Sequence, residues 1–415
     1  MNELGAASPR APWAVWLMAA YIVALVTLPV DVGLGVAGTI LTPARLILLA
    51  AVVLAATQLR SVLDALRGVP RIVWIGWAAF LGATLVTALL MPSAAAWARY
   101  GSLVGEGLVV FGLVTWAATA PRGLRSLVTV FALTMVGVAA VVLLLAVLGY
   151  RYDHVLSEMA GTVPAPEAAP RYGLERQAGP FRAPLYFAIW MTAASALLLP
   201  AIAQGARRTR VLATVAWLAL LIGVVGLTAS RLALTTMFLL PAAYFLVRGP
   251  RRVGLASLVT AAAIAFGLAR LIPYSPVIAE SNELRLAAIS PALQAIGMHP
   301  LFGWGLLSDS SVLSDIIGRT NYVDNTYLSL AVETGLIGLG AFLVLVVGIV
   351  FATRRGWVTS RGLALAIAVA SVLGMAVLAS LMQVTQGYAA FFVLAALAVA
   401  SAVRAADKGQ ATALT

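Results

Sequence analysis

The chain has 415 residues, of which 62% are hydrophobic and 10% charged, and its mean hydropathy is +1.01. This composition excludes a water-soluble globular domain, and the lack of cysteine excludes disulfides and thiol chemistry. The net charge of +12 is better explained by arginine-rich cytoplasmic loops than by nucleic-acid binding, because such loops orient membrane proteins.

Apolar runs of about 18 or more residues recur along the chain, and each can cross a hydrocarbon core about 30 Å thick. They predict an all-α polytopic membrane protein with about twelve transmembrane helices in a single transmembrane domain, residues 1–415. The predicted spans are 13–31, 42–59, 71–92, 101–120, 124–149, 184–204, 209–229, 231–247, 253–272, 326–352, 361–383 and 387–403.

Arginine and lysine recur in alternate short loops, which fall on one side of the membrane if the N-terminus is cytoplasmic. This pattern predicts that both termini are cytoplasmic and that two long loops, 150–183 and 273–325, lie on the outer face. The cytoplasmic loops are too short for a nucleotide-sugar or ATP-binding domain. Substrates are therefore expected to arrive from the membrane or from outside.

The outer loops contain arginines that the orientation rule does not require. A guanidinium group presents a fixed fork of donors suited to phosphate, although ion pairs with nearby glutamates are an alternative explanation. Arg231, in "TASRLAL" between two predicted spans, is a functional candidate because an arginine at membrane depth is costly, unless it reaches the headgroups. The loop arginines are Arg151, Arg171, Arg176, Arg182, Arg285 and Arg319, and the glutamates are Glu158, Glu175 and Glu283.

The second outer loop contains a helical pattern. Leu284, Ile289, Leu293 and Ile296 predict an amphipathic helix along the outer surface that ends near Gly297. Trp304 follows in "LFGWG", where its ring either stacks on a sugar or anchors the loop at the membrane interface.

The stretch "YVDNTYLSLAVETGLIGLG" opens the next predicted span with polar residues. Asp324, Asn325 and Thr326 each suit a helix N-cap. Glu333 would lie about 13 Å further along a continuous helix. An ionisable group at that depth needs a partner, for which an arginine is expected. Gly335, like Gly338, would let a neighbouring helix approach closely, so that Glu333 faces protein.

The stretch "DNTYLSLAVETGLIGLGAFL" resembles the signature of the O-antigen ligase and polymerase superfamily. Asn325, the nine residues 326–334, Gly335, two residues and Gly338 match its spacing. Upstream, "RQAGPFRAPLYFA", "TASRLAL" and "LRLAAISPALQAIGMHPLFGWG" resemble three more motifs in the family's order, so that the resemblance covers residues 170–345. The ligases have histidine at the position of Asp324, and this departure favours a polymerase.

The resemblance implies a glycosyltransferase with the helical, GT-C-like architecture of enzymes that use lipid-linked sugars. The donor would be a glycan on undecaprenyl pyrophosphate, the acceptor a second lipid-linked glycan, and the reaction inverting, without a metal or cofactor. The expected catalytic residues are Asp324 as base, with Arg231 and Arg285 stabilising the leaving pyrophosphate. Expected substrate-binding residues are Arg176, Arg182, Asn325, Tyr327, Glu333 and Trp304.

Several alternatives remain open. Aspartate is a weaker base than histidine, which leaves two roles open for Asp324. Either Asp324 acts as the base, or it only caps the helix. In the second case the base is Glu283, Asp309, Asp315 or no residue at all. The function is polymerisation of repeat units, ligase-type transfer of a finished glycan to a lipid or protein, or transport of the lipid-linked glycan. Transport is less favoured, because no internal repeat is evident. The expected location is the bacterial inner membrane, with the active site on the outer face and a chain-length regulator as a possible partner.

Overall fold

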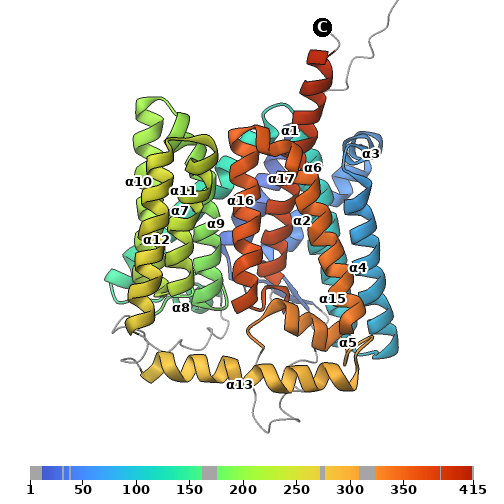
Figure 1. Cartoon of the computed structure of the whole chain (residues 1–415). Coiled ribbons are helices and arrows are strands. Elements are labelled where there is room, and N and C mark those ends of the chain that lie inside the picture. The colour runs from blue at the N-terminus through green and yellow to red at the C-terminus, as the bar shows by residue number, and fades with distance from the viewer. Residues whose placement is uncertain are drawn as a thin grey trace, which may run out of the picture.

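The computed structural model describes residues 12–29, 32–36, 39–160, 175–271, 276–307, 323–383 and 385–413. Long helices form a bundle, and α13 lies crosswise at one end of it, which we call the α13 end (Figure 1). The helices are α1 (Pro12–Thr27), α2 (Pro43–Ala56), α3 (Leu59–Arg67), α4 (Arg71–Leu90), α5 (Ala94–Ser102), α6 (Val110–Thr119), α7 (Gly123–Val147), α8 (Tyr152–Ala160), α9 (Pro184–Gln204), α10 (Arg207–Gly223), α11 (Arg231–Arg248), α12 (Arg251–Leu271), α13 (Pro276–Met298), α15 (Thr326–Thr353), α16 (Ser360–Met375) and α17 (Thr385–Ala413).

Each predicted span coincides with an apolar helix or with a pair of joined helices. Within the described residues, ten helices are long and apolar enough to cross a bilayer, and α2 with α3 adds an eleventh if this pair, bent by 96°, is one span. Helix α1 is apolar but has only 16 residues. The polytopic helical class is therefore confirmed, whereas the number twelve and the GT-C-like architecture stay predictions.

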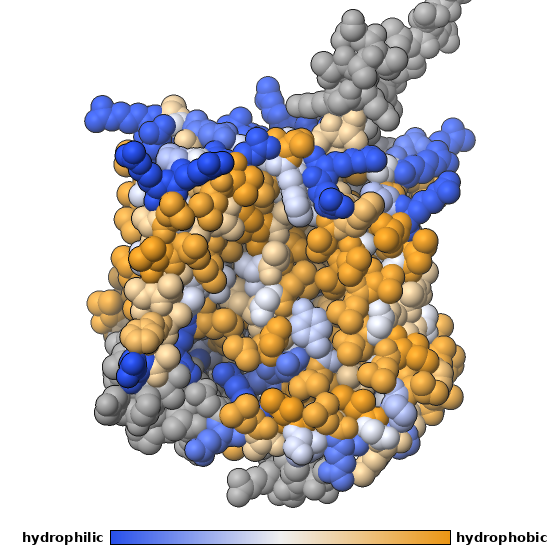
Figure 2. Space-filling view, in the orientation of Figure 1, coloured by the Kyte–Doolittle hydropathy of each residue, from blue (hydrophilic) through white to orange (hydrophobic). Residues whose placement is uncertain are grey.

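The surface of the bundle separates apolar from charged side chains. Apolar side chains cover the sides of the long helices, and hydrophilic side chains form a rim at the end opposite α13 (Figure 2). Val53 on α2, Val147 on α7 and Val259 on α12 are 60–77% exposed, as expected for helix faces turned toward lipid. The distribution supports a membrane protein.

Two central helices supply much of the core. Residues 388–400 of α17 and 187–196 of α9 are at most 1% exposed. The alanines among them allow neighbouring helices to approach closely. At another crossing, Gly76 lets α4 meet α15, because a Cβ there would lie 2.5 Å from Leu345 Cα.

Helix α15 is broken near its start. Gly335 has φ 67° and ψ −173°, a conformation that is essentially restricted to glycine. The first part of α15 runs along α13, and the second part turns into the bundle (Figure 1). The sequence predicted one continuous span over 326–352, whereas the helix bends at Gly335, just after Glu333. The part of α15 that carries Glu333 therefore runs along α13, and the expected depth of Glu333 in the membrane stays a prediction.

Helix α13 is present where the amphipathic helix was predicted, and it ends at Met298. Its side chains are arranged differently from a simple apolar face. Ala288, Ala292 and Ala295 are at most 3% exposed, whereas Leu293 is 55% exposed. The alanines and Ile296 therefore contact the protein, whereas Leu293 points away from it.

Shorter elements lie between the long helices. Strands β1 (Leu34–Val36) and β2 (Thr39–Leu41) form an antiparallel hairpin just before α2, which the sequence analysis did not predict. Two π-helical segments, Leu103–Val109 and Val224–Thr228, join α5 to α6 and follow α10. Such segments are often found at functional sites.

Candidate functional site

A cavity of about 520 Å³ at the α13 end brings together three of the predicted arginines. Arg176, Arg231 and Arg285 line it, with apolar side chains from α11, α12 and α13. Figure 2 shows hydrophilic side chains in a hollow above α13, within an otherwise apolar surface. The cavity is thus electropositive and adjoins surface that faces lipid.

The turn "TASR" positions Arg231. The π-helical segment after α10 ends at Thr228, and Ala229 reverses the chain in the left-handed conformation, with φ 48°. Ser230 then caps α11, because its hydroxyl accepts a hydrogen bond from the Ala233 N–H at 3.4 Å. Arg231 is therefore the first residue of α11 and lies at the N-terminus of the helix rather than in its interior.

Arg176 is held against the same turn. Its Nε donates a hydrogen bond to the Thr228 carbonyl at 3.0 Å. The neighbouring Gln177 N–H donates to the Leu227 carbonyl at 2.6 Å. The end of the first long loop is thereby fixed beside the start of α11, and two arginines that are 55 positions apart in the chain line one cavity.

Arg285 connects the cavity to Asp324. Its Nε lies 3.2 Å from Asp324 Oδ2, and the two side chains are 29% and 44% exposed. An exposed ion pair stabilises a fold by only about 0–1 kcal/mol, so stability alone does not account for this contact. Its consequence is that a carboxylate is placed at the edge of a cavity lined by guanidinium groups.

The start of α15 shows which residue caps the helix. Asn325 Oδ1 accepts hydrogen bonds from the N–H groups of Tyr327 at 2.9 Å and Leu328 at 3.1 Å. Asn325 is therefore the N-cap, and the alternative in which Asp324 only caps the helix is wrong for this structure. The Asp324 carboxylate is turned to Arg285 instead.

The segment around Asp324 is fixed to the turn between α16 and α17. The Thr326 N–H and hydroxyl both donate to the Ala379 carbonyl, at 3.1 and 2.5 Å. The Leu381 N–H donates to the Thr326 hydroxyl at 2.8 Å, and the Ser380 hydroxyl donates to the Val323 carbonyl. These buried hydrogen bonds hold the backbone on both sides of Asp324.

The loop after α13 fills the break in α15. The N–H groups of Trp304 and Gly305 donate to the carbonyls of Val332 and Glu333 at 2.9 and 3.0 Å. Beyond the break, the Leu336 N–H donates to the Pro300 carbonyl at 2.7 Å. Gly303 and Gly335 thus allow two backbones to meet, and the segment that approaches Gly335 is a loop rather than the helix expected from the sequence.

Gly338 has a more local role than the close approach predicted for it. A Cβ at this position would lie 2.0 Å from Thr334 Oγ1, within the same helix. Glu333 is buried, with 2% of its surface exposed, against the loop after α13. Its expected arginine partner stays a prediction.

The other predicted residues lie outside the arginine-lined cavity as described. Arg182 is exposed. Tyr327 donates from its hydroxyl to the Leu373 carbonyl at 3.0 Å. Trp304 donates from Nε1 to the Ala295 carbonyl at 2.8 Å, and its ring lies 4.1 Å from that of His299, so it packs between α13 and α15.

The remaining candidate bases are placed less favourably or fall outside the described residues. Glu283 is exposed on α13. Asp309 and Asp315 lie outside the described residues, as do Arg171 and Arg319. Among the described residues, no three histidine or acidic side chains gather as metal ligands would.

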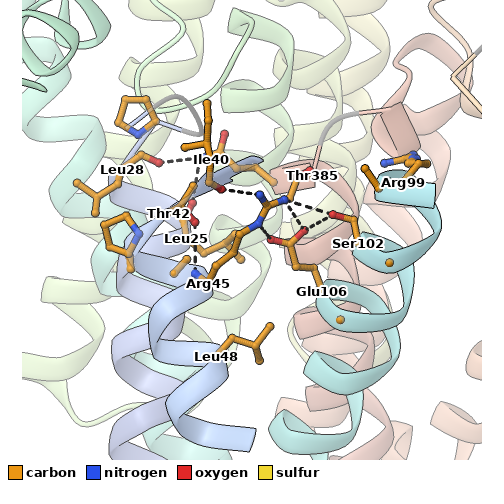
Figure 3. A pocket seen from close by; sticks show the side chains of 18 of the residues that line it. Leu25, Leu28, Ile40, Thr42, Arg45, Leu48, Arg99, Ser102, Glu106 and Thr385 are labelled. Atoms are coloured by element: carbon orange, nitrogen blue, oxygen red, sulfur yellow. Dashed lines mark hydrogen bonds and ion pairs between the residues drawn. The ribbon is translucent and has the colours of Figure 1, made fainter. Parts of the chain in front are cut away.

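A second cavity of about 610 Å³ lies between α1, α2, α5 and the start of α17, and the sequence analysis did not predict it. Figure 3 shows Arg45 and Glu106 paired in it. Arg45 Nε lies 2.8 Å from Glu106 Oε1, and Nη2 donates to Ser102 Oγ at 3.2 Å. Arg45 Nη1 also donates to the Ile40 carbonyl of β2 at 2.7 Å, which attaches the hairpin to this site.

Arg99 is the second cation in this cavity. It is 5% exposed, and its guanidinium lies over the Tyr388 ring, 4.7 Å from the centroid. Its buried Nε donates no hydrogen bond to any residue that the structure describes. A cation–π contact contributes about 0.5–2 kcal/mol, whereas removing a charge from water costs several kcal/mol. The ring alone therefore does not offset the burial of Arg99.

Two residues of this second site could have been found in the sequence, because they are ionisable residues inside predicted apolar spans. Glu106 lies inside the predicted span 101–120, and Arg45 lies four residues into the predicted span 42–59. An ionisable residue within a span is by default a functional candidate. The predicted site residues came from the outer loops, the "TASR" turn and the segment 324–333, and Arg45, Arg99 and Glu106 were not among them.

Comparison with known protein families finds a match to part of this chain. The family model described as O-antigen ligase matches residues 216–343, a range that includes Arg231, Arg285 and Asp324. A search of curated proteins finds no match.

Proposed function

We propose that this chain joins lipid-linked repeat units of a surface polysaccharide. The premise is that residues 216–343 place it in the O-antigen ligase and polymerase superfamily. Members of this family are glycosyltransferase-like enzymes of surface polysaccharide assembly. The proposed donor is a glycan on undecaprenyl pyrophosphate, and the proposed acceptor is a second lipid-linked repeat unit. The α13 end would then face the outside of the bacterial cytoplasmic membrane.

The arginine-lined cavity suits the leaving group of this reaction. When the glycosidic bond to a lipid pyrophosphate breaks, negative charge develops on the pyrophosphate oxygens. Arg176, Arg231 and Arg285 line one cavity and present guanidinium donors there. Fixed donors aimed at developing charge stabilise a transition state more than they stabilise the substrate. Adjoining apolar surface would accommodate the polyprenyl chain.

Asp324 is proposed as the general base. The acceptor hydroxyl attacks the anomeric carbon from the face opposite the pyrophosphate, so that the new C–O bond forms as the C–O bond to phosphate breaks. The proton of the attacking hydroxyl passes to the Asp324 carboxylate, and the lipid pyrophosphate leaves as an anion. Inversion follows from attack on the opposite face. General-base catalysis of this kind contributes about 10²–10⁴-fold.

One observation above all supports this proposal. Arg285 both lines the cavity and contacts Asp324, at 3.2 Å. Asn325 caps α15, so the Asp324 carboxylate is not needed as a helix cap. Base and leaving-group site are therefore adjacent, as a single displacement requires.

Ligase-type transfer is the second candidate function. The matching family model is described as O-antigen ligase, which favours it directly. Aspartate in place of the family's histidine favours the polymerase. Both reactions use the same donor chemistry and differ in the acceptor.

The test is transfer by the purified full chain in detergent. The donor is an undecaprenyl-pyrophosphate-linked repeat unit, and products are separated by size on a gel. Arg231→Gln removes one guanidinium from the cavity. Arg207→Gln is the matched control, because Arg207 is exposed in the first turn of α10 and lies outside both cavities.

A ladder of lengthened glycan with Arg207→Gln, and none with Arg231→Gln, would support the polymerase and the proposed donor site. Product that forms only after a different lipid or a protein acceptor is added would favour the ligase. An unchanged ladder with Arg231→Gln would contradict the proposed donor site.

A further inference from the structure

The cavity between α1, α2, α5 and α17 has no part in the donor chemistry proposed above. Arg45 and Arg99 face one carboxylate, Glu106, among the described residues that line it. Arg45 donates to Glu106, Ser102 and the Ile40 carbonyl, so its guanidinium is fully engaged. One positive charge remains, and it belongs to Arg99.

Arg99 is more than nine-tenths buried and lacks an anionic partner among the described residues. Its side chain is 5% exposed, its contact is the Tyr388 ring, and its Nε donates no hydrogen bond there. Figure 3 shows Arg99 apart from the Arg45–Glu106 pair, with no interaction drawn to it. Because the aromatic ring offsets only part of the burial cost, an anion in the cavity would complete this site.

Small residues keep the cavity open. Gly101 and Gly105 line it, and a Cβ at either position would meet no atom within 4 Å. The rest of the lining is largely apolar, including Leu25, Leu28 and Leu48. A charged head group attached to an apolar chain matches such a lining better than a free anion does.

The two cavities flank one turn. Leu378 lines the arginine-rich cavity, and Thr385 lines the second cavity seven residues later. Thr326, two residues after Asp324, is hydrogen-bonded to Ala379 in this same turn. The segment that carries the proposed base is therefore attached to the turn that contributes residues to both cavities.

The loop after α13 makes a second connection. It fills the break in α15, two residues after Glu333, and then reaches Leu307, which lines the second cavity. Figure 1 shows α11 and α12 on one side of the bundle and α2, α4 and α5 on the other, with α13 extending beneath both. The two cavities therefore lie on different sides of the bundle, near the same end.

We propose that the second cavity binds the phosphate or pyrophosphate head of the lipid-linked acceptor, with Arg99 as the principal cation. This inference rests on the proposed function. In a displacement with inversion the acceptor approaches from the side opposite the leaving pyrophosphate, and this cavity lies on a different side of the bundle from the donor arginines. Two lipid pyrophosphates would then be bound at once, which is a property of a polymerase.

The experiment counts bound lipids. The purified full chain is titrated with undecaprenyl pyrophosphate, and native mass spectrometry reports the number bound. Arg99→Gln removes the cation, and Gly101→Leu fills the cavity without contacting the protein at its Cβ. Arg231→Gln tests the donor site, and Arg207→Gln is the control. Thermal melting of each variant verifies that it is folded.

We expect two lipids on the unmodified chain and on Arg207→Gln. Arg99→Gln and Gly101→Leu should each weaken one of the two binding events by about tenfold or more, the effect of losing a charge-assisted hydrogen bond. Arg231→Gln should weaken the other. If Arg99→Gln fails to fold, Gly101→Leu still decides the result.

The outcomes separate this inference from the proposed function. If Arg231→Gln weakens lipid binding and neither Arg99→Gln nor Gly101→Leu does, the proposed second site is overturned and the proposed donor site stands. Binding that depends on Arg99 and Gly101 but not on Arg231 would overturn the proposed donor site and support the second one.

Competition identifies the source of the anion. Inorganic pyrophosphate and phosphatidylglycerol are each added with undecaprenyl pyrophosphate. If both competitors displace undecaprenyl pyrophosphate only weakly from the Arg99 site, this supports a site for a polyprenyl-linked head group. Displacement by phosphatidylglycerol at equal concentration would show a general phospholipid site and would overturn the assignment to an acceptor, as would equal displacement by inorganic pyrophosphate.

Discussion

Arg285 Nε and Asp324 Oδ2 lie 3.2 Å apart, and this contact joins the helix that crosses the end of the bundle to the start of a helix that enters it. The two residues are 39 positions apart in the chain. The contact matters for function because Arg285 also lines the donor cavity. Its exposure makes it a poor source of stability, so changes here should affect activity far more than folding.

Asp324→Asn should abolish most of the activity and leave the fold intact. It removes the proposed base, and the expected loss in the initial rate of glycan transfer is about 10²–10⁴-fold. The melting temperature should change little, because an exposed ion pair contributes about 0–1 kcal/mol. Retention of more than a tenth of the rate would contradict the assignment of the base.

Asn325→Ala should act on stability instead. Loss of an N-cap side chain costs about 1 kcal/mol, and the melting temperature should fall accordingly. Asn325→Ser should restore most of that stability, because serine also caps helices. If Asn325→Ser is stable and yet inactive, the amide contacts substrate, as the sequence analysis expected.

Gly335→Ala should damage the fold at the break in α15. The residue has φ 67°, and an added Cβ would lie 2.2 Å from the Leu301 carbonyl oxygen. Strain and overpacking together cost about 2–5 kcal/mol. Gly340→Ala is the control in the same helix, because its Cβ would meet nothing within 4 Å. Thermal melting in detergent compares the two, and equal melting temperatures would contradict the observed break.

Glu106→Gln should destabilise the chain by leaving Arg45 uncompensated. Removing one partner of a fully buried ion pair costs about 3–5 kcal/mol, and a smaller loss is expected here because the Arg45 side chain is 23% exposed. Replacing both residues by glutamine should recover part of that loss, because no charge is then left unpaired. The measurement is a double-mutant cycle of unfolding free energies, and additive effects of the two changes would argue against the pair.

Much of the helical framework could be predicted from the sequence. Whether a segment suits lipid is decided by its own composition, so the runs at 71–92, 124–149 and 184–204 were identified without any contacts. Capping is equally local, and the "DNT" start of α15 was located correctly. The hairpin of β1 and β2 was not predicted, since its strands have three residues each.

The break in α15 was decided elsewhere in the chain. The sequence around Gly335 reads as one apolar helix, and a continuous helix was the reasonable prediction. The structure instead pairs its backbone with residues 300–305, which supply hydrogen bonds that the helix loses at the break. The glycine conformation at the break is therefore stabilised by a segment that lies 30 positions earlier in the chain.

The sequence by itself determined the apolar helices, the motif residues Arg231, Arg285 and Asp324, and the match of residues 216–343 to the family model described as O-antigen ligase. Tertiary structure alone decided that three arginines share one cavity, that Asn325 rather than Asp324 caps α15, and that Arg45 meets Glu106. Helix formation depends on neighbours three or four residues away, whereas a site depends on side chains from distant segments. Those side chains meet only when the helices cross.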